Sequence, residues 1–357
     1  MMKRLGLKIL VLAVLLLAGS LASADKINFP DIPGYKTLKC DFHMHTVFSD
    51  GAVWPTVRVD EAVREGLDAI SITDHIEYQP KKADIPTNHN RPYEIAKEPA
   101  AKAGLVLIKG AEITRDTPPG HFNAIFLNDC ALLDTKEFLD AMKAANDQGA
   151  FVFWNHPDWK PDKKGWFEVH DTLYSGKLFH GIEVCNGGGY HLNGHIWGLE
   201  KNLTFMANSD MHAPFLIKKT TPEEHRTLTL VFAKEKSADA IKEALFAGRT
   251  AVWFKNQLIA KPDYADALFK AAVRVESAER RGQMVRVEIT NKCDLNIDLA
   301  RTGDLGPEKL ILPAMDTTII RVRPARGADK VELAYNAVNI LIGPGKSLPI
   351  RLTASVE

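Results

Sequence analysis

Histidine and acidic residues at the ends of apolar runs carry the clearest chemical signal in this sequence. His43 and His45 stand one residue apart at the end of the apolar run 38–45. Because the side chains of a β-strand alternate between its two faces, both imidazoles should share one face and bind one metal ion. Asp50 follows in a Ser-Asp-Gly turn, and the triplet Thr73-Asp74-His75 ends the next apolar run. This spacing indicates the beginning of a site for more than one metal ion.

The same residue types recur later in the chain. Glu112 ends the run 105–113, and Asp210 and His212 repeat the spacing of one intervening residue after the run 203–208. In total, six histidines and three acidic residues exceed the three or four protein ligands that one tetrahedral zinc ion takes. They predict two or three divalent ions that share a bridging carboxylate, and donors without sulfur favour zinc, manganese or iron. The predicted ligands are His43, His45, Asp50, His75, Glu112, His121, His156, Asp210 and His212.

The elements that would position these residues lie between residues 37 and 254. Apolar runs alternate there with amphipathic stretches, a pattern typical of parallel strands joined by helices. This pattern predicts an α/β fold, a closed or distorted (β/α)7 barrel, whose active site would gather at the carboxyl ends of the strands. Pro80 to Pro92 should form a surface loop beside the site. Helices are predicted at 56–65, 135–147 and 238–246, and strands at 38–45, 68–73, 105–113, 122–127, 150–155, 181–185, 203–208 and 227–232.

The character of the chain changes after Lys255. A helix is predicted at 264–278, followed by short alternating runs of β-branched residues with glycine turns between them. These runs indicate a small C-terminal β-sandwich, with strands at 285–290, 310–312, 317–322, 331–334 and 348–352. The predicted division is a signal peptide at 1–24, a metal-dependent barrel domain at 25–255, a connecting helix and linker at 256–283, and a C-terminal β domain at 284–357.

The first residues of the chain have the composition of an export signal. Lys3 and Arg4 precede the apolar run 9–18, and the small residues 22–24 form a cleavage site. The run is shorter than the roughly 20 residues that a membrane span needs, and no second span follows. We therefore expect a periplasmic or secreted protein that begins at Asp25 and has no membrane span after signal removal. The four cysteines lack a CxxC spacing, so no disulfide can be assigned and zinc binding by thiolates is not expected.

Overall composition excludes several classes of protein. The chain has 357 residues, of which 45% are hydrophobic and 25% charged, as in ordinary globular proteins. Lysine plus arginine and aspartate plus glutamate both number 45, so we expect no broad basic surface for nucleic acid. No feature of the sequence identifies a protein partner.

The order of these motifs resembles that of the PHP (polymerase and histidinol phosphatase) superfamily, in its secreted phosphodiesterase-like branch. The resemblance extends from about Lys36 to Trp253, and the HxH, SDG, TDH, Glu, His, His and DxH elements occur in family order. The family implies a distorted (β/α)7 barrel with a trinuclear metal centre. Carried over by position, the resemblance implies one ion held by His43, His45, Glu112 and Asp210, a second held by Glu112, His121 and His156, and a third held by Asp50, His75 and His212.

The chemistry expected of such a centre is attack on a phosphoryl group. Adjacent divalent ions lower the pKa of a bridging water towards about 7, which gives a hydroxide nucleophile. Basic side chains would neutralise the remaining phosphate oxygen and protonate the leaving group, and Arg115, Lys160 and Arg226 are the substrate-binding candidates. Arg249 lies in a Gly-Arg-Thr element that resembles a late element of the family, and is the catalytic candidate. Asp74 would act either as a proton shuttle or as an orienter of a ligand histidine.

These residues predict a metal-dependent phosphoesterase that hydrolyses small phosphodiesters, with a small phosphorylated molecule as its partner. A secreted phosphomonoesterase is the alternative that the same site could support. A non-catalytic binding module stabilised by metal, and an amidohydrolase that attacks a carbonyl, also stay open. Export argues against a role in histidine biosynthesis, because histidinol phosphate is a cytoplasmic metabolite.

Two further groups of residues allow more than one interpretation. His191 and His195 lie four residues apart, a spacing that can bind metal on a helix, but no acidic partner lies nearby in the sequence and we expect solvent exposure. Four aromatic residues could either wall a substrate pocket or pack the rim of the barrel. They are Trp54, Tyr78, Trp154 and Trp159.

Overall fold

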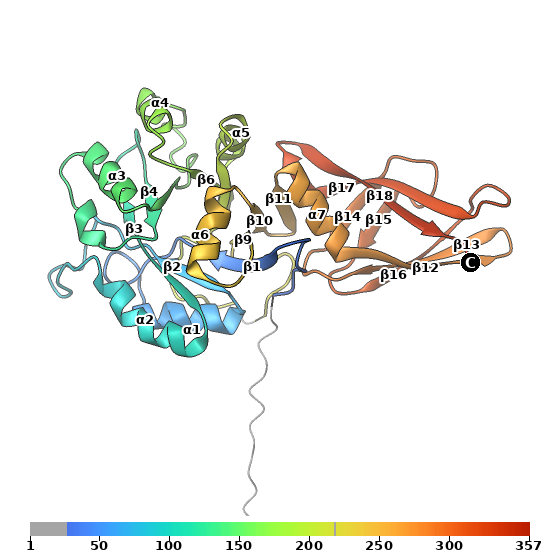
Figure 1. Ribbon diagram of the computed structural model, residues 1–357, viewed down its shortest axis with the longest axis horizontal. Helices are drawn as coiled ribbons and strands as arrows, with labels where there is room; N and C mark the ends of the chain where they lie inside the picture. The colour runs from blue at the N-terminus through green and yellow to red at the C-terminus, as the bar shows by residue number, and fades with distance from the viewer. Residues whose placement is uncertain (1–26, 218) are drawn as a thin grey trace, which may run out of the picture.

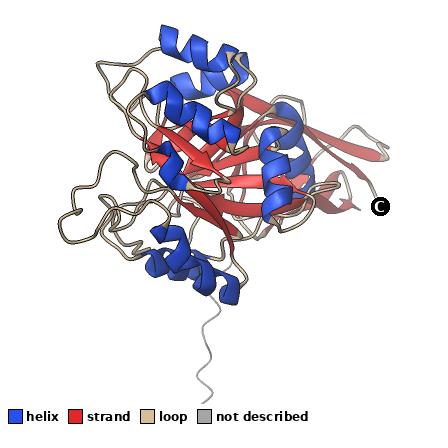
Figure 2. Cartoon of the chain, turned by 60° about the vertical axis from the view of Figure 1, so that its left-hand side comes forward, coloured by secondary structure: helices blue, strands red, loops and turns tan. Residues whose placement is uncertain are grey.

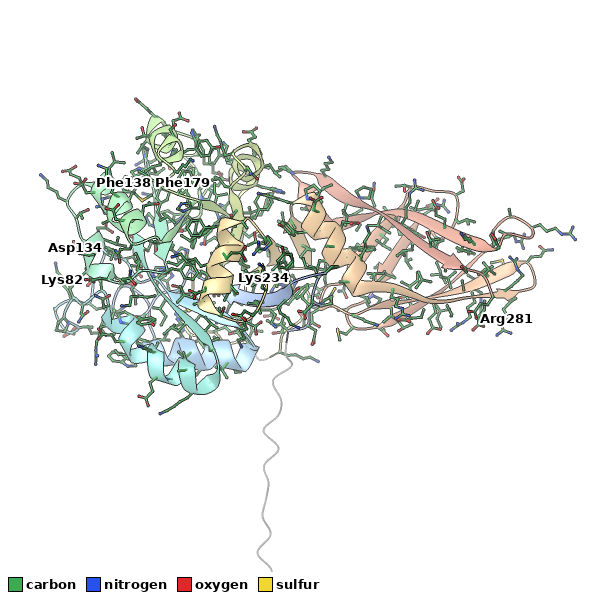
Figure 3. All side chains as sticks on the ribbon, viewed as in Figure 1. Lys82, Asp134, Phe138, Phe179, Lys234 and Arg281 are labelled. Carbon is green, nitrogen blue, oxygen red and sulfur yellow. The ribbon has the colours of Figure 1, made fainter. Side chains whose placement is uncertain are left out.

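An α/β domain and a smaller β domain lie end to end in the computed structural model, which describes residues 27–217 and 219–357 (Figure 1). The long axis runs from the α/β domain, where Lys82 is labelled, to the hairpin tip that carries Arg281 (Figure 3). The predicted export signal lies outside the described residues. Within the described ranges, no helix is long and apolar enough to cross a membrane.

The strands of the α/β domain belong to one mixed sheet that continues into the C-terminal domain. In chain order they are β1 (Lys36–Asp41), β2 (Ala69–Ile72), β3 (Val106–Ile113), β4 (Phe122–Ile125), β5 (Phe151–Trp154), β6 (Gly181–Asn186), β7 (Gly189–Tyr190), β8 (Thr204–Asn208), β9 (Leu228–Ala233), β10 (Thr250–Phe254) and β11 (Gln257–Ala260). All eight strands predicted for this part of the chain are therefore present.

The directions of the strands correct the expectation of a purely parallel sheet. Strands β1, β2 and β3 are parallel to one another, as are β5, β6 and β8. Strand β4 runs antiparallel to β3 and β5, and β9 runs antiparallel to β1. A parallel connection takes a dozen or more residues, usually with a helix, and the segment 114–121 between β3 and β4 is too short for one.

The backbone ladders do not close into a ring, so the predicted distorted (β/α)7 barrel is not confirmed. The open side is bridged by other hydrogen bonds. The Phe42 N–H donates to the side-chain oxygen of Asn208 over 2.8 Å, and the Asp210 N–H donates to the carbonyl of His43 over 2.8 Å. The Thr229 hydroxyl bonds to both the N–H and the carbonyl of Ala207. These contacts hold the end of β8 beside the end of β1 and the start of β9.

Helices cover the outer surface of the sheet (Figure 2). Helix α1 begins with Pro55 in its first turn and ends at Glu65, and the next residue, Gly66, has the φ of 76° that a left-handed cap requires. The residues before α2 form the predicted surface loop, although Pro92 already lies inside that helix. The helices are α1 (Pro55–Glu65), α2 (Arg91–Ala103), the 3₁₀ turn η1 (Cys130–Leu133), α3 (Phe138–Asp147), α4 (Glu168–Ser175), α5 (Leu192–Glu200), α6 (Ala238–Phe246) and α7 (Pro262–Ala272).

Two sheets form the C-terminal domain, in agreement with the predicted β-sandwich. Strands β12 (Val273–Arg281), β13 (Met284–Asn291) and β16 (Thr317–Val322) make one sheet. Strands β14 (Ile297–Arg301), β15 (Lys309–Leu312), β17 (Lys330–Gly343) and β18 (Lys346–Ser355) extend the sheet of the α/β domain, because β17 pairs in parallel with β11. Helix α7 ends earlier than predicted, since the alternating residues from Val273 onward pair with β13.

The four cysteines are all buried and free. Cys40 in β1 and Cys185 in β6 have no exposed surface. One cluster of buried hydrophobic side chains extends from Phe29 and Trp253 in the α/β domain to Leu333 and Leu352 in the β domain. The two domains therefore share part of one core.

A buried ion-pair network fixes helix α1 to the sheet, and Arg226 is its centre. The Arg226 guanidinium donates to Glu65 over 2.7 and 3.0 Å and to Asp41 over 2.9 Å, and its residue exposure is 2%. Burial alone would lower the pKa of Arg226, but Glu65 and Asp41 raise it above its ordinary value. Because the guanidinium is buried and already hydrogen-bonded to these carboxylates, the prediction that Arg226 binds substrate is wrong.

Replacing Arg226 by methionine should therefore destabilise the fold. Arg226→Met keeps most of the side-chain volume but leaves Glu65 and Asp41 buried without their partner, which typically costs about 3–5 kcal/mol. Urea unfolding of the two proteins measures the difference. Arg91→Met removes an exposed arginine paired with exposed Glu94 and should change stability by less than about 1 kcal/mol. Equal unfolding midpoints for Arg226→Met and the wild type would contradict this account.

Candidate metal centre

All nine predicted metal ligands lie together at one end of the sheet. His43 and His45 directly follow β1, and Glu112 lies near the end of β3. An isolated bridge pairs Glu112 with His75, which follows β2. Asp210 follows β8 and is held against His43 by the backbone bond described above. The other ligands are Asp50 in the turn after β1, His121 before β4, His156 after β5 and His212 after β8.

Two histidines and two carboxylates make close contacts at the centre of the site. The Nε2 atom of His43 lies 3.2 Å from both Glu112 Oε2 and Asp210 Oδ1. The Nε2 atom of His45 lies 3.3 Å from the same Glu112 oxygen and 3.0 Å from the same Asp210 oxygen. Metal–ligand bonds of about 2.0–2.2 Å in a tetrahedron place neighbouring donors about 3.3–3.6 Å apart. Each of the four histidine–carboxylate distances is therefore close to the spacing of two neighbouring donors on one metal ion.

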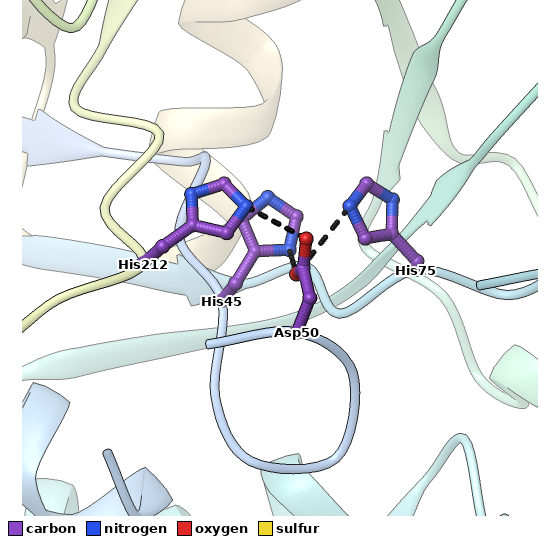
Figure 4. A group of neighbouring side chains, drawn as sticks. All are labelled: His45, Asp50, His75 and His212. Atoms are coloured by element: carbon purple, nitrogen blue, oxygen red, sulfur yellow. Dashed lines mark ion pairs between the residues drawn. The ribbon is translucent and has the colours of Figure 1, made fainter. Parts of the chain in front are cut away.

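A second group surrounds Asp50, as Figure 4 shows. One Asp50 oxygen lies 3.2 Å from His212 Nε2, and the other lies 3.6 Å from His75 Nε2 and 3.8 Å from His45 Nδ1. Donor atoms of these four residues all lie within 4.8 Å of one another. The ring of His45 thus stands between the two groups, with one nitrogen facing each.

Glu112 connects these groups to the remaining histidines. Its Oε2 atom faces His43, His45 and His75. Its Oε1 atom lies 2.9 Å from His121 Nδ1 and 3.9 Å from His156 Nε2. A carboxylate whose two oxygens face different sets of imidazoles has the geometry of a bridging ligand, the role that the family resemblance implies for this position.

Buried opposite charges shift the pKa values of these groups in opposite directions. Burial alone would lower the pKa of His43, but Asp210, Glu112 and Glu183 raise it well above its ordinary value. Burial alone would raise the pKa of Asp210, but His43 and His45 lower it well below its usual range. His156 is different, because burial dominates and lowers its pKa to about 4.

The residues present fit divalent metal ions. Three carboxylates face six imidazoles, and the described residues that line the pocket include no lysine or arginine. Buried carboxylates need nearby positive charge, which either protonated imidazoles or bound cations would supply. Nitrogen and oxygen donors without sulfur suit zinc, manganese or iron.

Glu183 orients the ligands from behind, and sequence reasoning missed it. The residue lies in β6 with no exposed surface. Its Oε1 atom lies 3.0 Å from His43 Nδ1, the ring nitrogen opposite the one that faces the ligand group. Its Oε2 atom accepts a 2.8 Å bond from the backbone N–H of His156, whose φ of 29° is uncommon for a residue other than glycine. A carboxylate in the middle of a predicted buried strand was the available signal.

Arg58 supports the backbone beneath the site and was also missed. It is 1% exposed, and its guanidinium donates to the carbonyls of His45, Met211 and Ala213 over 2.8–3.0 Å. Glu61 accepts a further bond of 2.8 Å and supplies the opposing charge. One side chain of α1 thus fixes the segments that carry the HxH and DxH ligands.

Asp74 holds the turn that carries Asp50. Its Oδ1 atom accepts bonds from the Thr46 N–H over 2.6 Å and the Ser49 hydroxyl over 2.7 Å. Its Oδ2 atom accepts the Thr46 hydroxyl over 2.6 Å. Both oxygens are engaged and Asp74 does not line the pocket, so the geometry favours the orienting role over the proton shuttle.

The pocket above these ligands has a volume of about 240 Å³, and seven of the nine ligand residues line it together with Tyr78, Thr114 and Trp159. Lys160 and Arg115 lie outside this lining. Lys160 Nζ is 2.6 Å from Asp116, and Arg115 is paired with Glu77. Contact of either cation with a phosphate stays a prediction.

Arg249 does not reach the site, so its predicted catalytic role is wrong. Its guanidinium bonds to the Glu243 carboxylate and donates to the carbonyl of Phe232 over 3.1 Å. It also lies 4.6 Å from the ring centre of Tyr35, which directly precedes β1. Arg249 therefore lies at the opposite end of β1 from the ligands, where it stabilises the packing of α6.

The expected solvent exposure of His191 and His195 is also wrong. The exposed fractions are 7% and 0%. His191 Nδ1 accepts the Asp158 N–H, and His195 Nδ1 bonds to the Tyr190 hydroxyl. Burial lowers the pKa of both imidazoles, and neither belongs to a metal-ligand group among the described residues.

Comparison with known proteins places this site in a family. The family model described as the PHP domain matches residues 41–218, which contain all nine predicted ligands. A solved two-domain protein from Bacteroides vulgatus, described as containing a predicted PHP-like metal-dependent phosphoesterase, is 45% identical with a TM-score of 0.88. That match covers 92% of this chain and 98% of the other. The chain belongs to the PHP superfamily. Residues 273–353 of this PHP protein match the model of an Ig-like domain.

A curated relative matches part of this chain. It is an uncharacterized protein of Methanocaldococcus jannaschii that is 26% identical over 204 residues. The alignment spans 50% of this chain and 83% of that protein.

Removing the negative charge of Glu183 should weaken metal binding by the PHP domain. In Glu183→Gln the amide nitrogen faces donors that now bond to a carboxylate oxygen, so His43 and His156 lose their orientation. Losses of such supporting carboxylates typically lower metal affinity about 10- to 100-fold. Competition with a chelator measures the affinity for zinc or manganese. Glu168→Gln changes an exposed glutamate on α4 and should leave the affinity unchanged. Unchanged affinity in Glu183→Gln would refute the orienting role.

A methyl group at Gly51 should disturb the ligand group around Asp50. A Cβ at this position would lie 2.5 Å from the backbone carbon and oxygen of His45, so the turn must move. We expect Gly51→Ala to retain about one metal ion fewer per chain than the wild type, as measured by elemental analysis of protein loaded with manganese. Gly188→Ala is the control, because a Cβ there meets no atom within 4 Å. Identical metal content in both variants would argue against Asp50 as a ligand.

Proposed function

We propose that this PHP protein is a metal-dependent phosphoesterase that hydrolyses small phosphodiesters. The observation that carries the proposal is the convergence of nine residues with nitrogen and oxygen donors, from seven segments of the chain, on one site, and seven of these residues line its pocket. The similarity to the Bacteroides vulgatus protein, whose description names a PHP-like metal-dependent phosphoesterase, supports the same reaction class. As part of this proposal, the site holds three divalent ions of zinc, manganese or iron.

The distances suggest which residues would hold each ion. His43, His45, Glu112 and Asp210 would hold the first. Glu112 would bridge to a second beside His121 and His156, and Asp50, His75 and His212 would hold the third, with His45 close to it. When bound, these ions would neutralise phosphoryl charge and lower the pKa of a coordinated water towards about 7.

The protein's own residues hold this arrangement in place and exclude solvent from part of it. Glu183 fixes the ring of His43, Arg58 fixes the backbone of His45, and Asp74 fixes the turn of Asp50. Rigid placement of this kind lowers the reaction barrier, because no reorganisation is needed when charge develops. Glu112, His43 and His45 have no exposed surface, so the phosphoryl group would meet the centre only through the pocket.

The charge of the pocket favours a diester over a monoester. A diester carries one negative charge and a monoester carries nearly two, so a monoester site usually adds a basic clamp. The described residues that line the pocket include no lysine or arginine. One observation supports a phosphomonoesterase as the second candidate: Lys160 stands beside Trp159 of the lining, and its partner Asp116 has a side chain that is 84% exposed. Release from Asp116 would give Lys160 access to a phosphate.

Export is part of the proposed function. The sequence of residues 1–24 has the charged start, apolar run and small-residue cleavage site of a signal peptide. We place the mature protein in the periplasm or outside the cell, where a phosphodiesterase would meet extracellular diesters.

A paired assay tests the reaction. Protein spanning Asp25 to Glu357 and loaded with manganese or zinc should hydrolyse bis(4-nitrophenyl) phosphate faster than 4-nitrophenyl phosphate. His43→Ala removes a buried ligand and should lower turnover at least about 100-fold, whereas His180→Gln, which changes an imidazole between Phe151 and Phe246, should keep it. Faster turnover of the monoester would favour the phosphatase. No turnover of either ester by fully metal-loaded protein would sink the proposal.

A further inference from the structure

Only part of a diester fits into the pocket at the metal centre. Its volume of about 240 Å³ lies below the about 300–1,000 Å³ of pockets that enclose small-molecule ligands. A phosphoryl group bound to the centre would take up part of this space. At least one of the two ester groups must then extend to the mouth of the pocket, where Trp159 and Tyr78 complete the lining.

Trp159 lies at this mouth on a turn that hydrogen bonds fix to His156 and to residues near the start of α5. The Trp159 N–H donates to the carbonyl of His156 over 2.9 Å, which closes the turn directly after a metal ligand. Within the turn, the Asp158 carboxylate accepts bonds of 2.7 and 3.0 Å from the side chain and backbone of Asn193 at the start of α5. The Asp158 N–H also bonds to buried His191. The backbone that carries the indole is therefore fixed in position.

The indole leaves a large surface open to a ligand. Its ring centre lies 5.6 Å from that of His121 and 5.4 Å from that of His156, so the ring borders the metal centre. Lys160 Nζ lies 5.3 Å over the ring and is held there by Asp116. Even with these neighbours, 57% of Trp159 is exposed. An exposed tryptophan fixed beside a reactive centre is a ready stacking surface, because its flat face binds planar groups without a hydrogen-bond partner.

We propose that Trp159 selects diesters that carry a planar aromatic group on the ester that is not cleaved, by stacking against that group at the mouth of the pocket. This inference rests on the proposed phosphodiesterase function and names the substrate class of that site. Aryl and nucleobase groups share the required chemistry, since both offer a flat π-face. Diesters with a short aliphatic group in that position gain nothing from the indole.

Three substrates with one leaving group test the inference. Bis(4-nitrophenyl) phosphate, thymidine 5′-(4-nitrophenyl phosphate) and ethyl 4-nitrophenyl phosphate all release 4-nitrophenolate and differ only in the retained group, which is aryl, nucleoside or aliphatic. The measured quantity is kcat/KM for each substrate, with metal content determined on the same samples. Trp159→Ala should lower the values for the aromatic substrates about 5- to 150-fold, the range expected for one stacking contact. The value for the ethyl ester should change less than about 2-fold, and Trp159→Phe should restore most of the loss.

Trp54→Ala is the matched control, because Trp54 is also exposed at 45% but does not line the pocket. It should change none of the three values. A loss confined to the aryl or to the nucleoside substrate supports stacking and identifies which source of the planar group the site prefers. Equal losses on all three substrates, or none, would overturn the selection by Trp159 while the phosphodiesterase function stands. Absence of turnover in metal-loaded wild-type protein would remove the proposed function itself, and the inference with it.

Discussion

The contact of one buried carboxylate, Glu112, with imidazoles from several parts of the chain is the interaction on which the site depends. Its oxygens face His43, His45 and His75 on one side and His121 on the other. Burying the charge of Glu112, which has no exposed surface, costs free energy unless groups of opposite charge or hydrogen-bond donors lie beside it. Each segment that carries one of these histidines must therefore place its imidazole next to Glu112. The surrounding fold can be understood as the means of meeting that requirement.

This placement is maintained by buried polar side chains that hydrogen-bond to the segments carrying the ligand residues. Arg58 and Arg226 neutralise buried acids of α1 and β1, while Glu183 and Asp74 engage the backs of the ligand segments. Each of these groups has several partners, so the network is nearly fully satisfied. Such networks keep ligand geometry fixed even before an ion is present, because a half-satisfied alternative would cost more free energy.

The sequence allowed the ligands to be predicted better than their supports. A side-chain period of two and the ends of apolar runs are local signals, and they identified all nine residues that the structure brings together, as well as every strand from β1 to β6. Glu183 and Arg58 escaped notice because their partners are distant in sequence, His43 and Met211 among them. The single basic residues Arg226 and Arg249 were misassigned for the same reason, since a lone arginine carries no local sign of the carboxylate that it pairs with. The antiparallel direction of β4 was missed because it follows from the short connection between β3 and β4, and the alternation of apolar runs does not reveal that length.

The pairing of β11 with β17 has a consequence for how the molecule is divided. The segment 256–283, predicted as a connecting helix and linker, contains a strand that pairs with β10 on one side and with a strand of the Ig-like domain on the other. A protein cut between its domains would expose unpaired N–H and C=O groups along a hydrophobic strand, which is a template for aggregation. The Ig-like domain thus covers this edge of the sheet of the α/β domain, and each domain protects a strand of the other from exposure.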